Sequence, residues 1–337
     1  MNAPNIPSQM TAIEISRPGG PDVLVPVQRP TPRPSEREVL IKVHAAGVNG
    51  PDVLQRKGLY APPPGVSDIP GLEISGEIVA LGAKVSNFAI GDKVMALVPG
   101  GGYAQYAVAD ERTTLHLPEG LRLEEAAALP ETFMTVWTNL FQRGQFKAGE
   151  TVLIHGGASG IGTTATMLAR AFGASQIFTT VKNEEQRAAS RSLGSDHPID
   201  YTRQDFVAEV MRETGGRGVD VVVDIIGGDY VDRNFQAAAM NGRIVQIGLV
   251  KGPAATVNYF QMLVKRLTHI GSTLRSRSHD EKKAIIDELE SQVWPHVRKG
   301  EVKPLVFKVF GLTEASAAHE LMDSGLHIGK IVLASQP

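Results

Sequence analysis

The sequence of 337 residues contains no cysteine. That absence excludes disulfide bonds, a cysteine nucleophile and every zinc site that is built on thiolates. Histidine occurs nine times, but no two histidines have the His-x-x-x-His or His-Glu-x-x-His spacing that is typical of zinc on one helix face. We therefore expect no bound metal, and we expect an organic cofactor to supply any difficult chemical step.

Neither sign of charge dominates, and long apolar runs are missing. Lys plus Arg number 34 and Asp plus Glu number 36, so the formal net charge is −2 and a nucleic-acid partner is not expected. No apolar run approaches the roughly 18 residues that span a bilayer, so we expect no membrane partner either. Residues 1–9 lack the charged start and apolar stretch of a signal peptide, and we interpret them as the frayed tail of a cytoplasmic protein.

One stretch, residues 151–162, combines a strand, a glycine-rich turn and the start of a helix. The apolar run 152–154 is typical of a buried parallel strand, and we expect the helix to stop at Gly173. The turn residues expected to bind a dinucleotide are Gly157, Ser159, Gly160, Ile161 and Gly162. Gly157 would allow the tight turn, Ser159 replaces the usual second glycine, and Gly162 would let the helix approach the strand. The helix N-terminus would then face the phosphates, although the glycine pattern alone also fits an ordinary strand-to-helix turn.

The end of the next predicted strand indicates which nicotinamide cofactor binds. NAD-binding proteins place a carboxylate about 20 residues past the glycines, whereas this chain has Lys182 there. The lysine would pair with a 2′-phosphate, and the Tyr201 hydroxyl could donate to the same group, each bond contributing about 1.5–3 kcal/mol. This pattern favours NADPH. The alternative is that Lys182 is a solvated lysine and that Glu184 binds the ribose.

Strands and helices alternate between residues 151 and 272. The expected strands are 152–155, 176–180, 197–200, 219–224, 243–247 and 267–272. Six strands separated by helices predict an α/β protein with a doubly wound parallel sheet. Short strands with turn signals between them precede this part, at 10–15, 39–43, 76–81, 93–97 and 102–108, and they predict a compact antiparallel β unit. The alternation ends after residue 272, with a helix expected at 279–299 and strands at 304–310 and 329–334, so we expect this tail to rejoin the β unit.

Five motifs together resemble a known family: they lie at residues 19–24, 45–49, 71–76, 152–162 and 329–333. In this order they are similar to the quinone oxidoreductase (zeta-crystallin-like) branch of the medium-chain dehydrogenase/reductase superfamily. The resemblance implies a Rossmann domain at 131–272 and a discontinuous, β-rich GroES-like domain at 1–130 and 273–337. It also implies an active site in the crevice between the two domains.

The resemblance further implies a zinc-free member of that superfamily. Zinc-dependent relatives carry Cys at the position of Asn49 and His at the position of Leu72, and only Glu73 is retained. In the family, Asn49 and Tyr60 match residues that face the nicotinamide and the substrate, so we expect them to be catalytic. Tyr60 has a second interpretation, as an anchor packed on the prolines 62–64 of its own loop.

Further cofactor contacts follow from the same resemblance. Thr135 matches a threonine near the carboxamide, and we expect Gly248, Leu274 and Lys330 also to bind the cofactor. The lysine that relatives commonly use for the phosphate lies a few positions after Lys182, where this chain has Gln186.

The function that the sequence favours is hydride transfer from NADPH to a small molecule, either a quinone or an α,β-unsaturated carbonyl. A homodimer is implied, and the segment 267–272 is the expected edge strand at its interface. Two alternatives stay open. One is a 2-enoyl thioester reductase, and the other is a non-catalytic, crystallin-like protein that only binds NADPH.

Overall fold

The computed structural model describes residues 6–335, which form two compact units. The first unit comprises residues 1–132, 275–298 and 303–337, and the second comprises 133–274 and 299–302. The predicted frayed tail falls mainly on residues 1–5, which lie outside the described residues. The division lies close to the predicted boundaries at 130/131 and 272/273, and it adds a short return of the chain at 299–302 to the second unit.

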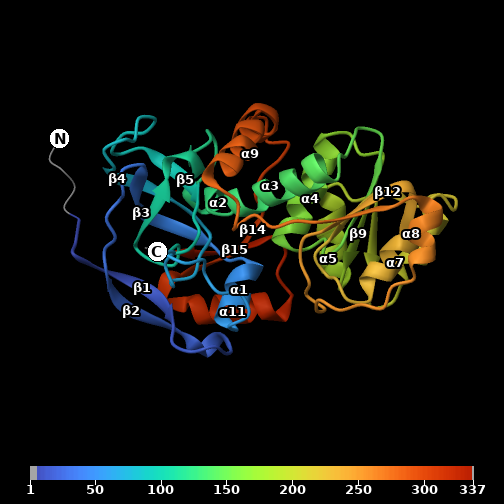
Figure 1. Ribbon diagram of the computed structural model, residues 1–337, viewed down its shortest axis with the longest axis horizontal. Helices are drawn as coiled ribbons and strands as arrows, with labels where there is room; N and C mark the ends of the chain where they lie inside the picture. Colours follow the sequence, from blue (N-terminus) through green and yellow to red (C-terminus); the bar gives the residue numbers. More distant parts are fainter. Residues whose placement is uncertain (1–5, 336–337) are drawn as a thin grey trace. The chain divides into compact units, whose positions relative to one another are not determined.

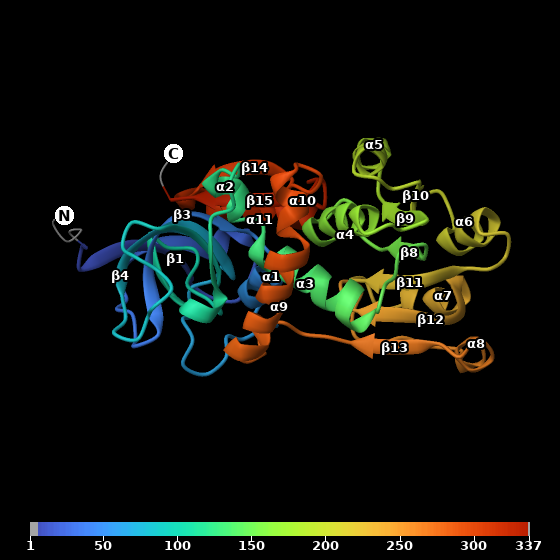
Figure 2. The ribbon, with the colours of Figure 1, turned by 90° about the horizontal axis from the view of Figure 1, so that it is seen from above.

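A six-stranded parallel sheet forms the second unit, in the order β10-β9-β8-β11-β12-β13. Its strands are β8 (Thr151–Ile154), β9 (Gln176–Val181), β10 (His197–Asp200), β11 (Val219–Asp224), β12 (Ala238–Gln246) and β13 (Thr268–Gly271). Its helices are η3 (Trp137–Arg143), α4 (Gly160–Ala171), α5 (Glu184–Ser192), α6 (Phe206–Glu213), α7 (Tyr230–Ala237) and α8 (Tyr259–Lys265). Helices flank both faces of this sheet (Figure 2), so the doubly wound α/β fold is confirmed.

The first unit contains a mixed seven-stranded sheet and a two-stranded β1-β2 ribbon. The strands are β1 (Gln9–Ile15), β2 (Leu24–Pro30), β3 (Glu38–Gly47), β4 (Glu73–Leu81), β5 (Lys93–Leu97), β6 (Tyr106–Asp110), β7 (Thr114–His116), β14 (Val306–Gly311) and β15 (Lys330–Ala334). The helices are η1 (Pro21–Val23), α1 (Gly50–Arg56), η2 (Glu111–Thr113), α2 (Leu123–Ala126), α9 (His279–Gln292), α10 (Trp294–Arg298), η4 (Leu312–Glu314) and α11 (Ala315–Ser324), and α3 (Pro130–Val136) crosses the boundary between the units. The late strand β15 pairs with the early strand β3 (Figure 1), as expected for a chain that returns to its first domain.

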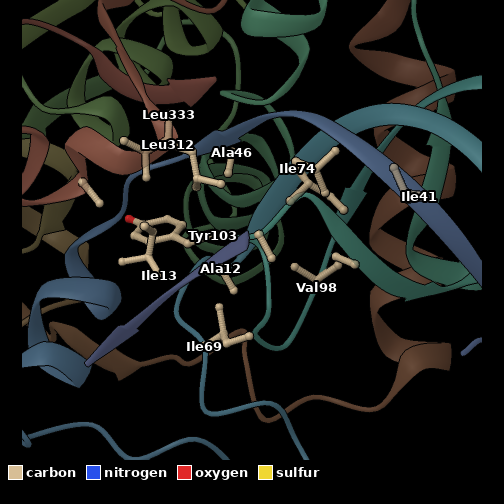
Figure 3. Close-up of a cluster of buried hydrophobic side chains, with 14 of the residues drawn as sticks. Ala12, Ile13, Ile41, Ala46, Ile69, Ile74, Val98, Tyr103, Leu312 and Leu333 are labelled. Carbon is tan, nitrogen blue, oxygen red and sulfur yellow. The ribbon is translucent and has the colours of Figure 1, made fainter. Parts of the chain in front are cut away.

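The core of the first unit collects apolar side chains from the start and the end of the chain. Ile13 from β1, Ile74 from β4 and Leu333 from β15 are all fully or almost fully buried in one cluster (Figure 3). Tyr103 lies in the same cluster with no exposed surface, so its hydroxyl must find partners inside the protein. Burial of this kind stabilises a domain by about 25 cal/mol per Å² of apolar surface.

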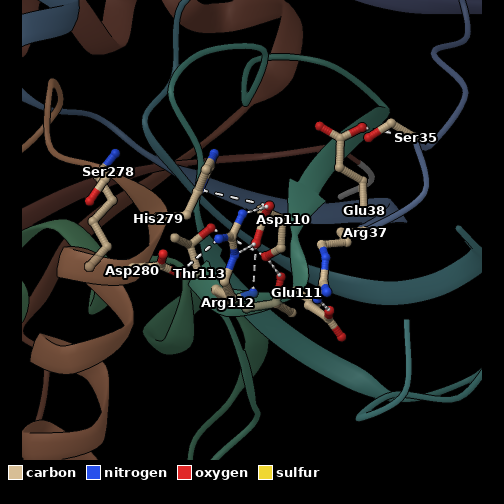
Figure 4. Close-up of polar contacts among 12 residues, drawn as sticks. Ser35, Arg37, Glu38, Asp110, Glu111, Arg112, Thr113, Ser278, His279 and Asp280 are labelled. Carbon is tan, nitrogen blue, oxygen red and sulfur yellow. Dashed lines mark hydrogen bonds and ion pairs between the residues drawn. The ribbon is translucent and has the colours of Figure 1, made fainter. Parts of the chain in front are cut away.

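Helix α9 is fixed to the first unit by an ion-pair cluster at its N-terminus (Figure 4). The Arg112 guanidinium donates to both carboxylate oxygens of Asp110 at 2.8 Å and to Asp280 at the start of α9, also at 2.8 Å. Burial on its own would raise the pKa of Asp110, but the Arg112 bonds hold that pKa below its ordinary value. A capping box between Ser278 and Glu281 begins the helix.

Two predicted elements differ from the observed ones. The helix expected at 279–299 is interrupted at Val293 and resumes as α10 at Trp294, because Pro295 has no backbone N–H to continue the hydrogen-bond ladder. The strand expected at 102–108 begins only at Tyr106, because the preceding residues bond to two other segments. The Tyr103 N–H donates to the Pro70 carbonyl at 2.9 Å, and the Tyr103 carbonyl accepts from the Ile13 N–H of β1 at 2.8 Å.

Candidate active site

The glycine-rich turn of the second unit follows β8, as predicted, but its glycines have other structural roles than the predicted ones. Gly156, not Gly157, takes the left-handed conformation with φ +70° that makes the tight turn. A Cβ on Gly157 would lie 2.6 Å from the Thr179 side chain, so this glycine permits close strand contact. A Cβ on Gly162 would lie 2.2 Å from the Gly156 carbonyl oxygen, so Gly162 lets helix α4 fold back on the turn itself rather than on the strand.

Ser159 has a structural reason to replace glycine. It is the N-cap of α4, and its Oγ accepts a hydrogen bond from the Gly162 N–H at 3.0 Å. Gly160 and Ile161 form the first turn of the helix and are partly exposed. The helix ends at Ala171, and Gly173 adopts φ +85°, which confirms the predicted stop.

Lys182 and Tyr201 directly follow two neighbouring strands, β9 and β10. Strands β9 and β10 pair with Val181 opposite Asp200, and the Tyr201 N–H donates to the Val181 carbonyl at 3.1 Å. Both side chains therefore leave the same edge of the parallel sheet, and both are exposed. Burial of part of the ring raises the pKa of Tyr201, which keeps its hydroxyl a hydrogen-bond donor.

Glu184 and Gln186, the two other residues considered for this edge, already form hydrogen bonds within the protein. The Glu184 carboxylate accepts from the Arg187 guanidinium at 2.9 Å, one turn along α5. Gln186 is buried, and its Oε1 accepts from the Lys182 N–H at 3.0 Å. Gln186 thus shapes the chain that carries Lys182, at the position where relatives commonly have a lysine.

The remaining predicted cofactor residues of the second unit lie at separate points. Gly248 follows β12, and a Cβ there would meet the Ile225 carbonyl oxygen at 2.9 Å. Thr135 is buried in α3, where its carbonyl accepts from the Asn139 side chain at 2.7 Å. Leu274 is also buried.

His155 is a structural histidine. Its ring is fully buried, with Nε2 2.7 Å from the Asn234 Oδ1 and Nδ1 3.2 Å from the Thr180 hydroxyl. Phe206 and Tyr230 pack edge-on against the ring. Burial lowers its pKa, so the ring is neutral.

In the first unit, Asn49 and Lys330 meet, although 281 positions separate them. The Lys330 ammonium donates to the Asn49 Oδ1 at 2.6 Å and to the Val48 carbonyl at 2.9 Å, and it pairs with the Glu73 Oε1 at 2.7 Å. The Asn49 side-chain amide in turn donates to Glu73 at 3.0 Å. A buried lysine ammonium therefore contacts both of the polar residues at the positions where zinc-dependent relatives place metal ligands.

Asp52 connects this cluster to a buried polar chain that the sequence did not reveal. Its carboxylate accepts from the Asn49 N–H at 2.8 Å, the Gly71 N–H at 3.0 Å and the Tyr103 hydroxyl at 3.2 Å. Burial raises the pKa of Asp52 to about 6 against these donors. The Tyr103 hydroxyl also lies 3.0 Å from His319, whose pKa burial lowers to about 3.

Tyr60 lies against a second cationic group, Arg275. The guanidinium carbon is 5.2 Å from the centre of the Tyr60 ring. Arg275 donates from Nε to the Pro99 carbonyl at 2.9 Å and from Nη2 to the Gln55 Oε1 at 3.1 Å, and the residue is 8% exposed. Its Nη1 has no hydrogen-bond partner within residues 6–335. Tyr60 itself is half-buried, and burial raises the pKa of its hydroxyl.

Glu131 and Lys282 complete the charged groups around Arg275. The Glu131 N–H donates to Glu73 Oε2 at 2.8 Å, and the Lys282 ammonium donates to the Arg275 carbonyl at 3.0 Å. Burial and the Glu73 charge raise the pKa of Glu131 to about 8, whereas burial lowers the pKa of Lys282. Sequence patterns could not single out these residues, because a charged residue has the same letter whether it is buried or solvated.

No metal-binding group is formed by three or more His, Asp or Glu side chains in the part of the chain that the structure describes. Within residues 6–335, no helix is both long and apolar enough to cross a membrane.

Comparison with known proteins matches both units. Residues 35–119 match the alcohol dehydrogenase GroES-like domain family, and residues 160–291 match the zinc-binding dehydrogenase family. A quinone oxidoreductase of Rattus norvegicus is 31% identical over 327 residues, which cover 96% of this chain and 97% of that protein. The first unit is therefore the GroES-like domain and the second the Rossmann domain.

Solved structures give the same assignment. Escherichia coli quinone oxidoreductase complexed with NADPH has a TM-score of 0.86 at 28% identity, covering 96% of this chain and 99% of the other. The CurK enoyl reductase has a TM-score of 0.84 at 30% identity, covering 97% of this chain and 99% of the other. This chain is an oxidoreductase that belongs to the quinone oxidoreductase branch of the medium-chain dehydrogenase/reductase superfamily.

Proposed function

We propose that this protein uses NADPH to reduce a small-molecule quinone or α,β-unsaturated carbonyl without zinc. The observation that carries the cofactor choice is that Lys182 and Tyr201 follow the paired strand ends Val181 and Asp200 at one sheet edge, while Glu184 forms an ion pair with Arg187. A 2′-phosphate would find a cation and a hydroxyl donor there, and no free carboxylate of Glu184 to repel it. The E. coli relative, which is described as complexed with NADPH, supports the same choice.

The cofactor would be held by residues of the Rossmann unit. The turn from Gly157 to Gly162 and the N-terminus of α4 are the pyrophosphate site that we propose, because Gly160 and Ile161 in the first turn of α4 are partly exposed and the N-terminus of a helix attracts anions. Thr135, Gly248 and Leu274 stay predicted contacts. When bound, the reduced nicotinamide supplies a hydride to the acceptor.

Zinc independence is supported by the Lys330 ammonium. It already satisfies the Asn49 amide oxygen and one Glu73 oxygen, which are the groups a cation at this place would need. Because Lys330 also donates to the Val48 carbonyl, its three N–H donors are all used. A role for Lys330 in binding the cofactor, as predicted, would therefore act through its charge or require it to release one of these bonds.

The 2-enoyl thioester reductase is the second candidate function. It is favoured by the structural similarity to an enoyl reductase. Both reactions need the same hydride and differ in the acceptor, which is larger for a thioester of coenzyme A.

A cytoplasmic homodimer is part of the proposal. Strand β13 is the edge of the parallel sheet and is largely exposed, so its backbone groups are available for pairing with a second copy. The adjacent helix α8 exposes Tyr259, Phe260 and Leu263 by 62–74%, as expected for a covered apolar surface. Light scattering that gives the mass of a monomer at micromolar concentration would contradict the dimer.

Steady-state NADPH oxidation with a quinone, an enone and an enoyl-CoA tests the function. Turnover with the first two supports the proposal, a strong preference for enoyl-CoA supports the thioester reductase, and no turnover with any of them leaves a cofactor-binding protein.

For the cofactor, we expect NADPH to bind at least about tenfold tighter than NADH, consistent with one charge-assisted bond. Lys182→Ala should reduce the ratio of the NADH and NADPH dissociation constants. Lys147→Ala, which replaces an exposed lysine of the same unit, should leave this ratio unchanged. Equal dissociation constants of the two cofactors in wild-type protein would overturn the NADPH assignment.

A further inference from the structure

Arg275 of the GroES-like unit is a buried cation that is bonded only to neutral groups. The residue is 8% exposed, and its guanidinium donates to the Pro99 carbonyl oxygen at 2.9 Å and to the Gln55 Oε1 at 3.1 Å. Its Nη1 is buried and has no hydrogen-bond partner within residues 6–335. Because a buried charge is costly unless it is paired, a guanidinium in this state is suited to bind an anion from outside the protein.

A second buried cation lies next to Arg275. Lys282 of α9 is 5% exposed, and its ammonium donates to the Arg275 carbonyl at 3.0 Å. Glu131 acts on both cations electrostatically, but in the described part of the chain it forms an ion pair with neither. Burial lowers the pKa of Arg275 and the pKa of Lys282, as expected for cations whose charge the surroundings do not fully balance. An added negative charge would therefore be favourable here.

The Tyr60 ring relates this place to the acceptor. The guanidinium carbon of Arg275 is 5.2 Å from the centre of the ring, and Tyr60 is the residue that we expect to face the acceptor. Nη1 is covered, whereas Tyr60 is only half-buried, so a ligand must displace a neighbouring side chain to reach Nη1. An anionic group bound at Nη1 would then lie close to the part of the acceptor that Tyr60 faces.

We propose that Arg275 binds a carboxylate that the acceptor carries close to its reducible group. This inference rests on the proposed function and narrows its substrate class to quinones or α,β-unsaturated carbonyl compounds that are also acids. One carboxylate oxygen would accept a charge-assisted hydrogen bond from Nη1, and Lys282 would add a second positive charge nearby. A carboxylate fits better than a phosphate, because a phosphate has three oxygens that need donors and Nη1 is a single nitrogen.

Thermal unfolding with two small probes tests the site without turnover. Benzoate should raise the unfolding midpoint, because a ligand that binds only the folded state stabilises it, whereas its neutral analogue benzamide should not. Arg275→Gln should abolish the benzoate effect, and Arg275→Lys, which keeps the charge, should retain part of it. Arg33→Gln replaces an exposed arginine of the same unit, and this control should respond like wild type.

Lys282→Met is a second variant, which leaves the bonds of the Arg275 guanidinium to Pro99 and Gln55 in place. It removes only the neighbouring charge, so it should weaken the benzoate effect without abolishing it. An undiminished benzoate effect in both Arg275→Gln and Lys282→Met would mean that benzoate binds elsewhere and would overturn the proposal.

Turnover gives an independent readout. An enone that carries a carboxylate beside its carbonyl should have a kcat/KM roughly ten- to a hundredfold above that of the corresponding amide, since one hydrogen bond between charged groups contributes about that factor. Most of the difference should lie in KM. Arg275→Gln should reduce the ratio of the two kcat/KM values to about one, and Arg33→Gln should leave the ratio unchanged.

The two readouts separate the site from the proposed function. Stabilisation by benzoate that depends on Arg275, in a protein that reduces none of the acceptors, would support the anion site and refute the proposed function alone. Turnover of quinones or enones with no preference for the carboxylate, together with equal midpoints in benzoate and benzamide, would overturn the role of Arg275. Stabilisation by inorganic phosphate but not by benzoate would overturn the choice of a carboxylate.

Discussion

The two units of this protein build their polar sites in opposite ways. The Rossmann unit uses backbone and small residues within one short stretch, where Ser159 caps α4 and Gly162 contacts the Gly156 carbonyl. The GroES-like unit brings together buried charges from distant parts of the chain, such as Glu73 and Lys330. A backbone site tolerates few changes of shape, whereas a site of paired charges depends on every partner being present.

Breaking the charge cluster should have the largest effect. Lys330→Met would leave the fully buried Glu73 without its cation, and removing one partner of a buried pair costs about 3–5 kcal/mol. Urea unfolding would measure this loss. Lys42→Met, an exposed lysine on β3 of the same unit, is the control and should change stability by less than about 0.5 kcal/mol. An equal, small effect of both substitutions would show that the cluster does not stabilise the unit.

A side chain added in the glycine-rich turn should have the next largest effect on stability. A Cβ at Gly162 would lie 2.2 Å from the Gly156 carbonyl oxygen, and overpacking of this kind costs about 1–3 kcal/mol. We expect Gly162→Ala to lower both the thermal unfolding midpoint and NADPH affinity. Gly50→Ala, at the start of α1 where a Cβ meets nothing within 4 Å, should leave both unchanged. Normal NADPH binding by Gly162→Ala would argue against this turn as the pyrophosphate site.

A substitution at Tyr60 tests whether this residue of the GroES-like unit takes part in the reaction or only packs its loop. If its hydroxyl donates to the acceptor oxygen as negative charge develops, Tyr60→Phe should lower kcat/KM for a quinone by roughly ten- to a hundredfold, about 1.4–2.7 kcal/mol. The phenylalanine ring would keep its place beside Arg275, so NADPH affinity should not change. An unchanged stopped-flow rate of hydride transfer would instead make Tyr60 an anchor of its proline-rich loop.

Substitutions of Ser159, the N-cap of α4, test how much this local contact stabilises the Rossmann unit. Ser159→Ala removes the acceptor of the Gly162 N–H and should lower stability by about 1 kcal/mol. Ser159→Gly should cost only a few tenths of that, since glycine leaves the N–H open to water. Thermal unfolding of the two variants side by side would show the difference, and equal midpoints would mean that the cap is not stabilising.

Chelation should have the smallest effect. Because the Lys330 ammonium satisfies Asn49 and Glu73, we expect prolonged treatment with a chelator to leave activity unchanged. Stoichiometric zinc in elemental analysis, lost together with activity, would contradict the proposed zinc independence.

Sequence by itself determined the features that depend on neighbouring residues. The β8-turn-α4 unit, the stop at Gly173 and the alternation of six parallel strands with helices all follow from local patterns, because periodicity, turn chemistry and helix capping act over a few positions. Even there, the prediction that Gly157 makes the tight turn was wrong. Gly156 makes it, because the φ angle of a turn residue is set by how the following helix packs.

Only the tertiary structure decided which charges are buried and what they contact. Lys330 reaches Asn49 because β15 returns to pair with β3, and Arg275 reaches Gln55 across 220 positions. Neither contact has a signature in the sequence, because a buried and a solvated lysine or arginine are the same letter. Burial is also what raises the pKa of Glu131 to about 8, so this unusual carboxyl group could be recognised only in the folded chain.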